Sequence, residues 1–162
     1  METTISATRG RASFEDLYAT HAPDARRVAY LLVGDRTQAE GITQEAFIKV
    51  LGRFGDLRKP EAFRTYLMRT VVSLTKNHFR RRALERRPVM APEPQTTASL
   101  DRDDDLFDAL NALPERQRVA LVLRYCEDLS ENQTAEILGT SSKAVKSLVT
   151  RGLAALRKEV VR

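Results

Sequence analysis

The sequence predicts an all-α protein made of two small helical domains joined by a flexible linker. Apolar residues recur at helical spacing in two stretches, and no stretch alternates apolar and polar residues as a strand would. Capping residues and glycines bracket these stretches. Between them lies an acidic segment with three prolines. Within the 162 residues we expect a flexible N-terminus at 1–12, a first domain at 13–82, a linker at 83–105 and a second domain at 106–162.

The first domain begins with two predicted helices. Ser13 can cap a helix that contains Phe14, Leu17 and Tyr18. Pro23 suits the first turn of a second helix, and Gly34 is a natural stop for it.

Two longer helices follow in the first domain. Thr37 and Glu40 form a capping-box pattern that predicts a helix running through Phe54 and ending at Gly55. Pro60 is a favourable first residue for the last helix. The predicted buried face of that helix consists of Phe63, Leu67, Thr70, Val71 and Leu74.

The last helix of the first domain carries a second, polar stripe. Arg69, Lys76 and Arg80 fall on one side of it, and Ser73 and Asn77 lie close to them. A basic, amide-bearing stripe suits the backbone and base edges of DNA, although a solvated charged face has the same pattern.

The second domain begins with an apolar stripe and a longer helix. The stripe consists of Leu106, Phe107, Leu110 and Leu113. Pro114 predicts the start of a helix that continues through Val119, Leu121, Val122, Leu123 and Tyr125.

The end of the second domain predicts a helix-turn-helix. Ser130 and Gln133 form a capping box, Gly139 ends the short helix, and Ser141 can cap the next one. In that next helix the apolar residues share one face and leave a donor-rich face outside. The exposed donors are Lys143, Lys146, Ser147, Thr150 and Arg151. This is the helix-turn-helix pattern, in which a short helix and a tight turn lead to a longer helix with an exposed polar face. That longer helix binds in the major groove of DNA.

Charge and composition favour a nucleic-acid partner and exclude several other classes. The formal net charge is +5. Residues 1–82 carry 15 basic and 9 acidic residues (+6), 83–105 carry 3 and 6 (−3), and 106–162 carry 9 and 7 (+2). One cysteine and two histidines predict neither a disulfide framework nor a metal site. Without a glycine loop or catalytic cluster, we expect no cofactor, no small-molecule substrate and no enzymatic activity.

The chain is expected to be cytoplasmic. No apolar run approaches the ~20 residues that cross a bilayer, so no direct membrane insertion is predicted. The N-terminus has no signal-peptide pattern.

Three motif blocks resemble the extracytoplasmic-function (ECF) sigma factors of the sigma-70 family, from about Phe14 to Lys158. Residues 113–157 are similar to region 4, with the sequence LPERQRVALVLRYCEDLSENQTAEILGTSSKAVKSLVTRGLAALR. Residues 39–50 resemble region 2.2, with the sequence AEGITQEAFIKV. Residues 63–82 resemble regions 2.3 and 2.4, with the sequence FRTYLMRTVVSLTKNHFRRR.

The resemblance implies a sigma factor that binds core RNA polymerase and directs promoter-specific initiation. Region 2 would dock on the clamp helices of the largest subunit through Glu40, Gln44, Glu45 and Lys49. It would read the −10 element through Asp56, Arg58, Lys59, Arg64, Tyr66, Arg69, Ser73, Asn77 and Arg80. Region 4 would contact the flap region and read the −35 element through Lys143, Lys146, Ser147, Thr150 and Arg151. An anti-sigma factor is the expected controlling partner.

Six positions depart from the family pattern. Gly41 stands where the family usually has Asp, and Tyr66 stands in place of the usual Trp. Residues 71–73 are Val-Val-Ser instead of Ala-Arg-Asn, and Asn77 replaces an Asp. The −10 sequence that other members read therefore does not transfer to this chain.

Two other classes are weighed against this interpretation. A stand-alone helix-turn-helix repressor or activator would need a dimer interface or an effector pocket, and would bind duplex DNA tightly without polymerase. A metal-dependent nuclease would need converging carboxylates. The acidic cluster Asp101, Asp103, Asp104 and Asp105 lies in the predicted linker and is interpreted as a solvating run before a helix. Cys126 is interpreted as a helix-end residue, not a redox sensor, and His78 as a packing or hydrogen-bonding residue.

Overall fold

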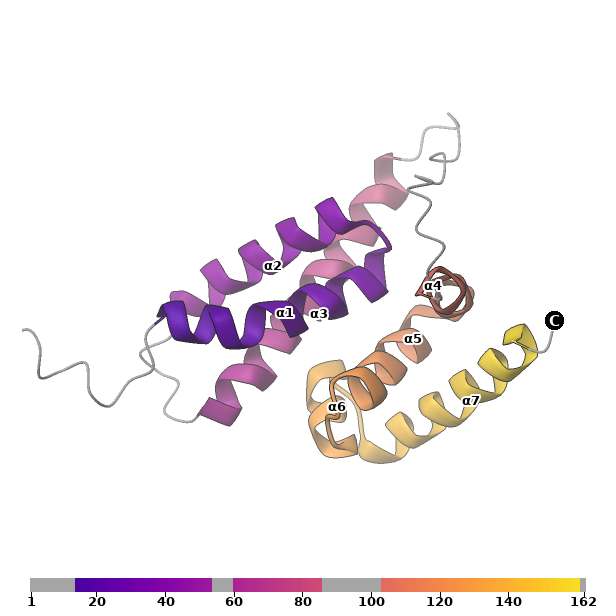
Figure 1. Ribbon diagram of the computed structural model, residues 1–162. Helices are drawn as coiled ribbons and strands as arrows, with labels where there is room; N and C mark the ends of the chain where they lie inside the picture. The colour runs from indigo at the N-terminus through magenta and orange to yellow at the C-terminus, as the bar shows by residue number, and fades with distance from the viewer. Residues whose placement is uncertain (1–13, 54–59, 86–102, 161–162) are drawn as a thin grey trace, which may run out of the picture.

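The computed structural model describes residues 14–53, 60–85 and 103–160, and every element in these ranges is helical (Figure 1). The N-terminal half consists of α1 (Phe14–Val33), α2 (Arg36–Leu51) and α3 (Pro60–Glu85). The C-terminal half consists of α4 (Asp103–Asn111), α5 (Glu115–Leu121), the π-helical turn η3 (Val122–Cys126), α6 (Glu131–Leu138) and α7 (Ser142–Val160). The predicted all-α class is confirmed. No helix in the described ranges is long and apolar enough to span a membrane.

The N-terminal half is a three-helix bundle. Helix α1 packs on α2 and α3, and α2 also packs on α3 (Figure 1). Phe47 is fully buried among these helices, with its ring 4.8 Å from Tyr18 and 6.2 Å from Phe63 between centroids. The predicted buried residues Leu67 and Val71 are also inaccessible to solvent. Thr70, expected on the same face, is only half-buried and donates to the carbonyl of Tyr66.

The two short helices predicted at the N-terminus are a single helix, so that prediction was wrong. Residues 14–33 are continuously helical, with the exposed Pro23 inside. Proline removes one backbone hydrogen bond from a helix interior. Tertiary packing offsets this loss here, since Ala22, Ala25 and Val28 are buried on both sides of it. Ser13 lies outside the described residues. Gly34 ends the helix as predicted, with a φ of +75°.

The cap and the end of α2 also differ from the prediction. Asp35, two residues before Thr37, is the N-cap, and its Oδ1 accepts from the backbone N–H of Gln38 at 2.9 Å. Glu40 is therefore not a capping residue. The helix ends at Leu51, because Gly52 forms the C-cap. Phe54 and Gly55 lie outside the described residues.

The C-terminal half contains the predicted helix-turn-helix and a turn that was not predicted. The helix that opens after Pro114 changes at Val122 to π-helical hydrogen bonding and ends at Cys126. Tyr125, through which the helix was predicted to continue, lies in this π-helical turn and is 61% exposed. Leu110 and Leu113 are buried as predicted, whereas Leu106 of the same stripe is 46% exposed.

The two halves pack against each other along a second buried stripe of α3. Arg64, Met68, Val72, Thr75 and Phe79 share one side of this helix by their spacing, and we call them the inner stripe. Its middle three residues are at most 2% exposed, and α3 packs on α6. Its two ends contact the C-terminal half directly, as Arg64 bonds to Glu127 and Phe79 lies 5.9 Å from the guanidinium of Arg118.

Arg118 joins the ends of two helices that belong to different halves. Its side chain is buried and donates to the carbonyls of Leu110 (3.0 Å), Asn111 (3.1 Å) and Leu113 (3.1 Å) at the end of α4. It also donates to Leu32 near the end of α1 at 3.2 Å. Arg118 thus supplies donors to carbonyls that a helix end leaves without partners.

The predicted linker is shorter at both ends than 83–105. Residues 83–85 are the last of α3 and residues 103–105 the first of α4. The acidic residues 103–105 therefore stand in the first turn of a helix, where negative charge is favourable. The other predicted linker residues, 86–102, and the N-terminal residues 1–12 lie outside the described ranges.

Candidate nucleic-acid interface

The turn between α6 and α7 is fixed by three local signals that the sequence predicted. Ser130 accepts from the backbone N–H of Gln133 at 3.1 Å, and the Gln133 side chain accepts from the N–H of Ser130 at 2.9 Å. Gly139 has a φ of +64°, which ends α6. Ser141 accepts from the N–H of Ala144 at 3.1 Å at the start of α7. These caps hold α7 at a defined angle to α6.

The outer face of α7 carries the five predicted donors. Lys143, Lys146, Thr150 and Arg151 are exposed, and Ser147 is half-buried. The inner face is held by Val145, which is fully buried, and by Gly152, where an added Cβ would lie 2.8 Å from Cδ1 of Leu121. Helix α7 therefore approaches α5 closely, and its donor face stays free.

Two interactions organise the donors on α7. The Arg151 guanidinium donates to Oγ of Ser147 at 2.8 Å, one turn earlier. The ammonium of Lys146 lies 3.8 Å from the carboxylate of Glu131, at the start of α6. Glu131 is an acidic neighbour of this face that the sequence analysis did not consider, and it weakens the local positive field.

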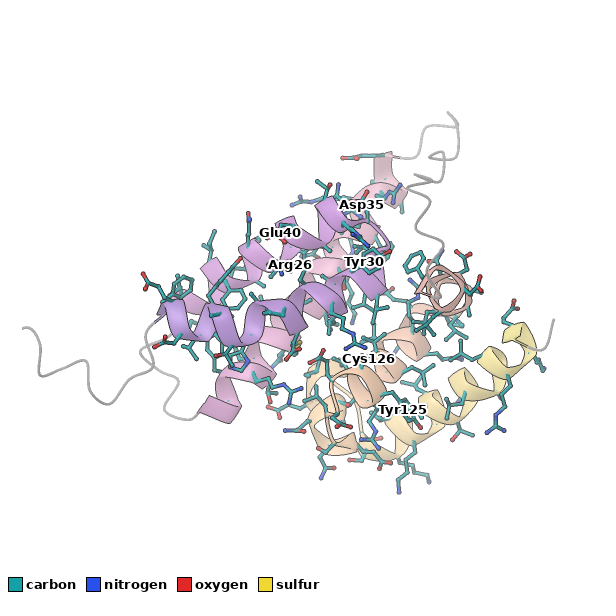
Figure 2. The ribbon with its side chains drawn as sticks, viewed as in Figure 1. Arg26, Tyr30, Asp35, Glu40, Tyr125 and Cys126 are labelled. Atoms are coloured by element: carbon teal, nitrogen blue, oxygen red, sulfur yellow. The ribbon has the colours of Figure 1, made fainter. Side chains whose placement is uncertain are left out.

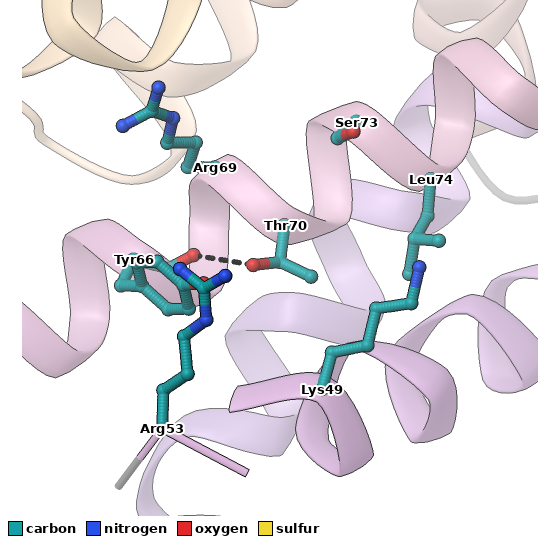
Figure 3. A pocket seen from close by; sticks show the side chains of 7 residues that line it. All are labelled: Lys49, Arg53, Tyr66, Arg69, Thr70, Ser73 and Leu74. Atoms are coloured by element: carbon teal, nitrogen blue, oxygen red, sulfur yellow. Dashed lines mark hydrogen bonds between the residues drawn. The ribbon is translucent and has the colours of Figure 1, made fainter. Parts of the chain in front are cut away.

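The second candidate surface is the outer face of α3. The predicted DNA contacts Arg69, Ser73, Asn77 and Arg80 are exposed on it, and Tyr66 is half-buried. Part of this face forms a groove of about 350 Å³ between α2 and α3 (Figure 3). It is lined by Lys49, Arg53, Tyr66, Arg69, Thr70, Ser73 and Leu74.

The groove combines three cations with one aromatic ring. The guanidinium of Arg53 lies 5.9 Å from the centroid of Tyr66, and Figure 3 shows it in front of the ring. Arg53 was not predicted as a site residue, because nothing in the local pattern distinguishes it from a solvated arginine. Lys49, predicted to contact polymerase, lines the same groove as predicted DNA contacts. The groove can accept an anion beside a planar ring.

Arg64 is separated from the other predicted −10 residues. It lies on the inner stripe, donates to Oε2 of Glu127 at 3.1 Å, and also donates to the backbone carbonyl of Glu127. Three more predicted −10 residues, Asp56, Arg58 and Lys59, lie outside the described residues.

The predicted polymerase contacts share the exposed side of α2. Glu40 forms an ion pair of 2.5 Å with Arg26 of α1 (Figure 2). Gln44, one turn further along α2, donates from its amide to Oε1 of Glu40 at 3.4 Å. Glu45 and Lys49 pair at 3.7 Å. Among them Ile48 is 68% exposed, an apolar side chain that the sequence analysis did not consider. Its position on α2 close to the charged residues Glu45 and Lys49 could have indicated that it is exposed.

Three observations concern the remaining titratable side chains of the described residues. No group of three potential metal ligands occurs within the described residues. Burial raises the pKa of the Cys126 thiol, which disfavours the reactive thiolate. Burial lowers the pKa of His78, which packs edge-on against Phe79 at 5.7 Å. This packing agrees with the predicted role of His78.

Comparison with known proteins identifies two family regions. Residues 17–85 match the model of Sigma-70 region 2, and residues 103–156 match that of Sigma-70, region 4. The RNA polymerase sigma-E factor of Streptomyces coelicolor is 33% identical over 152 residues, covering 91% of this chain and 86% of that protein. The RNA polymerase sigma factor SigV of Bacillus subtilis is 29% identical and covers 88% of this chain and 87% of its own length.

Solved structures share the fold over most of the chain. The sigma factor RpoE in complex with the anti-sigma factor NepR from Bartonella quintana aligns with a TM-score of 0.75 at 23% identity, covering 91% of this chain and 96% of that one. CnrH in complex with the cytosolic domain of CnrY aligns with a TM-score of 0.73 at 23% identity, covering 91% and 86%. With both family regions in order and relatives matched over nearly their whole length, this chain belongs to the ECF sigma factors of the sigma-70 family.

Proposed function

We propose that this chain binds core RNA polymerase and directs it to promoters, reading the −35 element with α7 and the −10 element with α3. In this proposal residues 13–82 act as region 2 and residues 106–162 as region 4. The supporting observation is the free donor face of α7, held by a capped turn. DNA recognition needs such donors on a rigid element.

At the −35 element, α7 would lie in the major groove. Arg151 suits a guanine edge, since its fork can bond both O6 and N7. The hydrogen bond that Arg151 donates to Oγ of Ser147 orients this guanidinium before DNA arrives. Lys146 and Thr150 would contact bases or phosphates beside it, and Lys143 at the start of the helix would contact the backbone.

At the −10 element, the outer face of α3 would hold the non-template strand. Arg69 and Arg80 suit backbone phosphates, and Ser73 and Asn77 suit base edges. The ring of Tyr66 offers a stacking surface for an unpaired base, and stacking of this kind contributes about 1–3 kcal/mol per base. Unstacking and unpairing a base costs a few kcal/mol. We therefore expect −10 binding to require polymerase and to favour a melted bubble.

The exposed side of α2 would dock on the polymerase clamp helices. Ile48 supplies an apolar centre, and Gln44, Glu45 and Lys49 supply a polar rim, which is the usual composition of a protein interface. The C-terminal half would contact the flap region. One of the solved structures named above, RpoE, is a complex with the anti-sigma factor NepR, which supports an anti-sigma factor as a further partner.

Reconstituted transcription tests this function. Added to core polymerase, the chain should give specific transcripts from a small promoter set. Arg151→Ala should weaken −35 recognition by about 1–3 kcal/mol, whereas the exposed Lys158→Ala, near the far end of the same helix, should leave promoter preference unchanged. Equal transcription with and without the chain, or tight promoter binding without polymerase, would contradict the proposal.

A further inference from the structure

One acidic side chain lies at the edge of the predicted DNA-binding face of α7. Glu131 is the first residue of α6, and its carboxylate lies 3.8 Å from the ammonium of Lys146. Three of the predicted −35 contacts are cations, namely Lys143, Lys146 and Arg151. Among the described residues, Lys146 is the one of these three that pairs with a carboxylate. The ion pair therefore lies on the face that would meet DNA.

The local structure of α6 does not require this ion pair. The N-cap is Ser130, and its reciprocal partner in the capping box is Gln133. The link between α6 and α7 is made by Asn132, which accepts from Oγ of Ser142. An acidic residue in the first turn is favoured by the helix dipole, which accounts for a charge at Glu131 but not for its approach to Lys146.

The start of α6 would lie close to the phosphate backbone of bound DNA. In a helix-turn-helix the second helix enters the major groove and the first helix crosses the backbone. Here α7 is the second helix and α6 the first. A helix N-terminus attracts phosphate, because its free N–H groups and its dipole are positive. Glu131, with a side chain that is 33% exposed, places a negative charge there and opposes this attraction.

Lys146 can bind two kinds of acceptor on DNA, and Glu131 affects them differently. A phosphate that binds Lys146 comes close to the Glu131 carboxylate and is repelled by it. The O6 and N7 atoms of guanine carry no formal charge, so they meet no such repulsion. The ammonium has three N–H donors, so it can bond a base and the carboxylate together. Glu131 therefore favours base contacts over backbone contacts by Lys146.

We propose that Glu131 is a specificity-determining residue, which weakens sequence-independent binding by α7 more than binding to the −35 element. This rests on the proposed reading of the −35 element by α7. Phosphate contacts carry no sequence information, whereas contacts to base edges do. Specificity is a difference between two affinities, so a residue that penalises the wrong site raises it.

The test compares variants of the full chain in reconstituted polymerase holoenzyme. Glu131→Gln removes the charge at nearly constant shape, and Glu131→Asp keeps the charge. Glu136→Gln is the matched control, because Glu136 lies on the same helix and is exposed. Fluorescence anisotropy measures binding to a promoter duplex that the wild-type holoenzyme transcribes and to the same duplex with a scrambled −35 element, each at several salt concentrations. Circular dichroism checks that each variant is helical.

Glu131→Gln should bind the scrambled duplex about two- to fivefold more tightly, the range that an exposed ion pair supports. Its affinity for the intact promoter should change by a smaller factor. On the scrambled duplex the slope of log K against log salt should steepen by about 0.9, which corresponds to one added phosphate contact. In the Lys146→Ala background this steepening should disappear, because Lys146 makes the added contact. Glu131→Asp and Glu136→Gln should keep the wild-type preference and slope.

If the wild type prefers the intact promoter and Glu131→Gln has the same preference and slope, the role of Glu131 is overturned while the sigma-factor function stands. An equal change of affinity for both duplexes with an unchanged slope would also overturn it, since damage to α6 has that effect. If the wild-type holoenzyme binds both duplexes equally, the proposed −35 recognition by α7 itself fails.

Discussion

Replacing Arg118 should destabilise the whole chain more than replacing any neighbouring arginine. The side chain donates four hydrogen bonds to backbone carbonyls, three at the end of α4 and one at the end of α1. In Arg118→Ala these four carbonyls lose their donor. At about 1 kcal/mol for each bond, the free energy of unfolding should fall by about 4 kcal/mol.

A loss of about 1 kcal/mol for each bond is below the range of about 1.5–3 kcal/mol that is usual for hydrogen bonds to charged groups, because Arg118 is buried. Burial lowers the pKa of this guanidinium, which means that its charge is partly unfavourable inside the protein. Removing the charge relieves that cost and offsets part of the loss. Arg118→Lys keeps the charge but replaces the planar guanidinium with a single ammonium group. This group can reach at most about half of the carbonyls, so we expect the free energy of unfolding to fall by about 2 kcal/mol.

Urea denaturation followed by circular dichroism measures these losses through the midpoint and the slope. Arg116→Ala is the matched control, since Arg116 lies on the same helix and is exposed. It should change stability by less than about 0.5 kcal/mol. If Arg118→Ala and Arg116→Ala have the same midpoint, the four hydrogen bonds do not stabilise the fold as argued.

Glycine substitutions give two further predictions, checked by the same denaturation. Gly41 is exposed within α2 and an added Cβ meets nothing within 4 Å, so Gly41→Ala should stabilise the chain by up to about 1 kcal/mol; a loss of stability would refute this. Gly34→Ala should destabilise the chain more than Gly139→Ala. Both glycines have a positive φ, but only at Gly34 would an added Cβ clash, since it would lie 2.0 Å from Cζ of Phe107. Positive φ alone costs about 1–2 kcal/mol, so equal losses in the two variants would show that Phe107 moves away without cost.

Sequence analysis succeeded where the signal and the structure lie within a few residues of each other. The capping box at Ser130 and Gln133, the stop at Gly139 and the cap at Ser141 each depend on contacts over three or four positions. Their chemistry is local, so it can be predicted without knowing what packs above them. The donor face of α7 was predicted for the same reason, as its inner face follows from helical periodicity.

Contacts between distant segments could not be predicted in this way. The middle of the inner stripe of α3 is buried, and α6 packs on α3. The local pattern does not indicate which helix packs there. In the sequence, Arg118 cannot be distinguished from the surface arginines of a basic chain. One of its acceptors, the carbonyl of Leu32, is 86 residues away and cannot be predicted from local pattern. Pro23 indicated a helix boundary by local rules, and packing on both sides of it overrode them.

The inner stripe also constrains how this chain can diverge. Met68 and Val72 need a cover whether the halves are joined or apart, since bare apolar side chains favour aggregation. Any protein that separates the halves must shield that side of α3 or leave it exposed to water. A substitution there changes the contact between α3 and the C-terminal half, so these positions should tolerate fewer replacements than the solvent-facing side of the same helix.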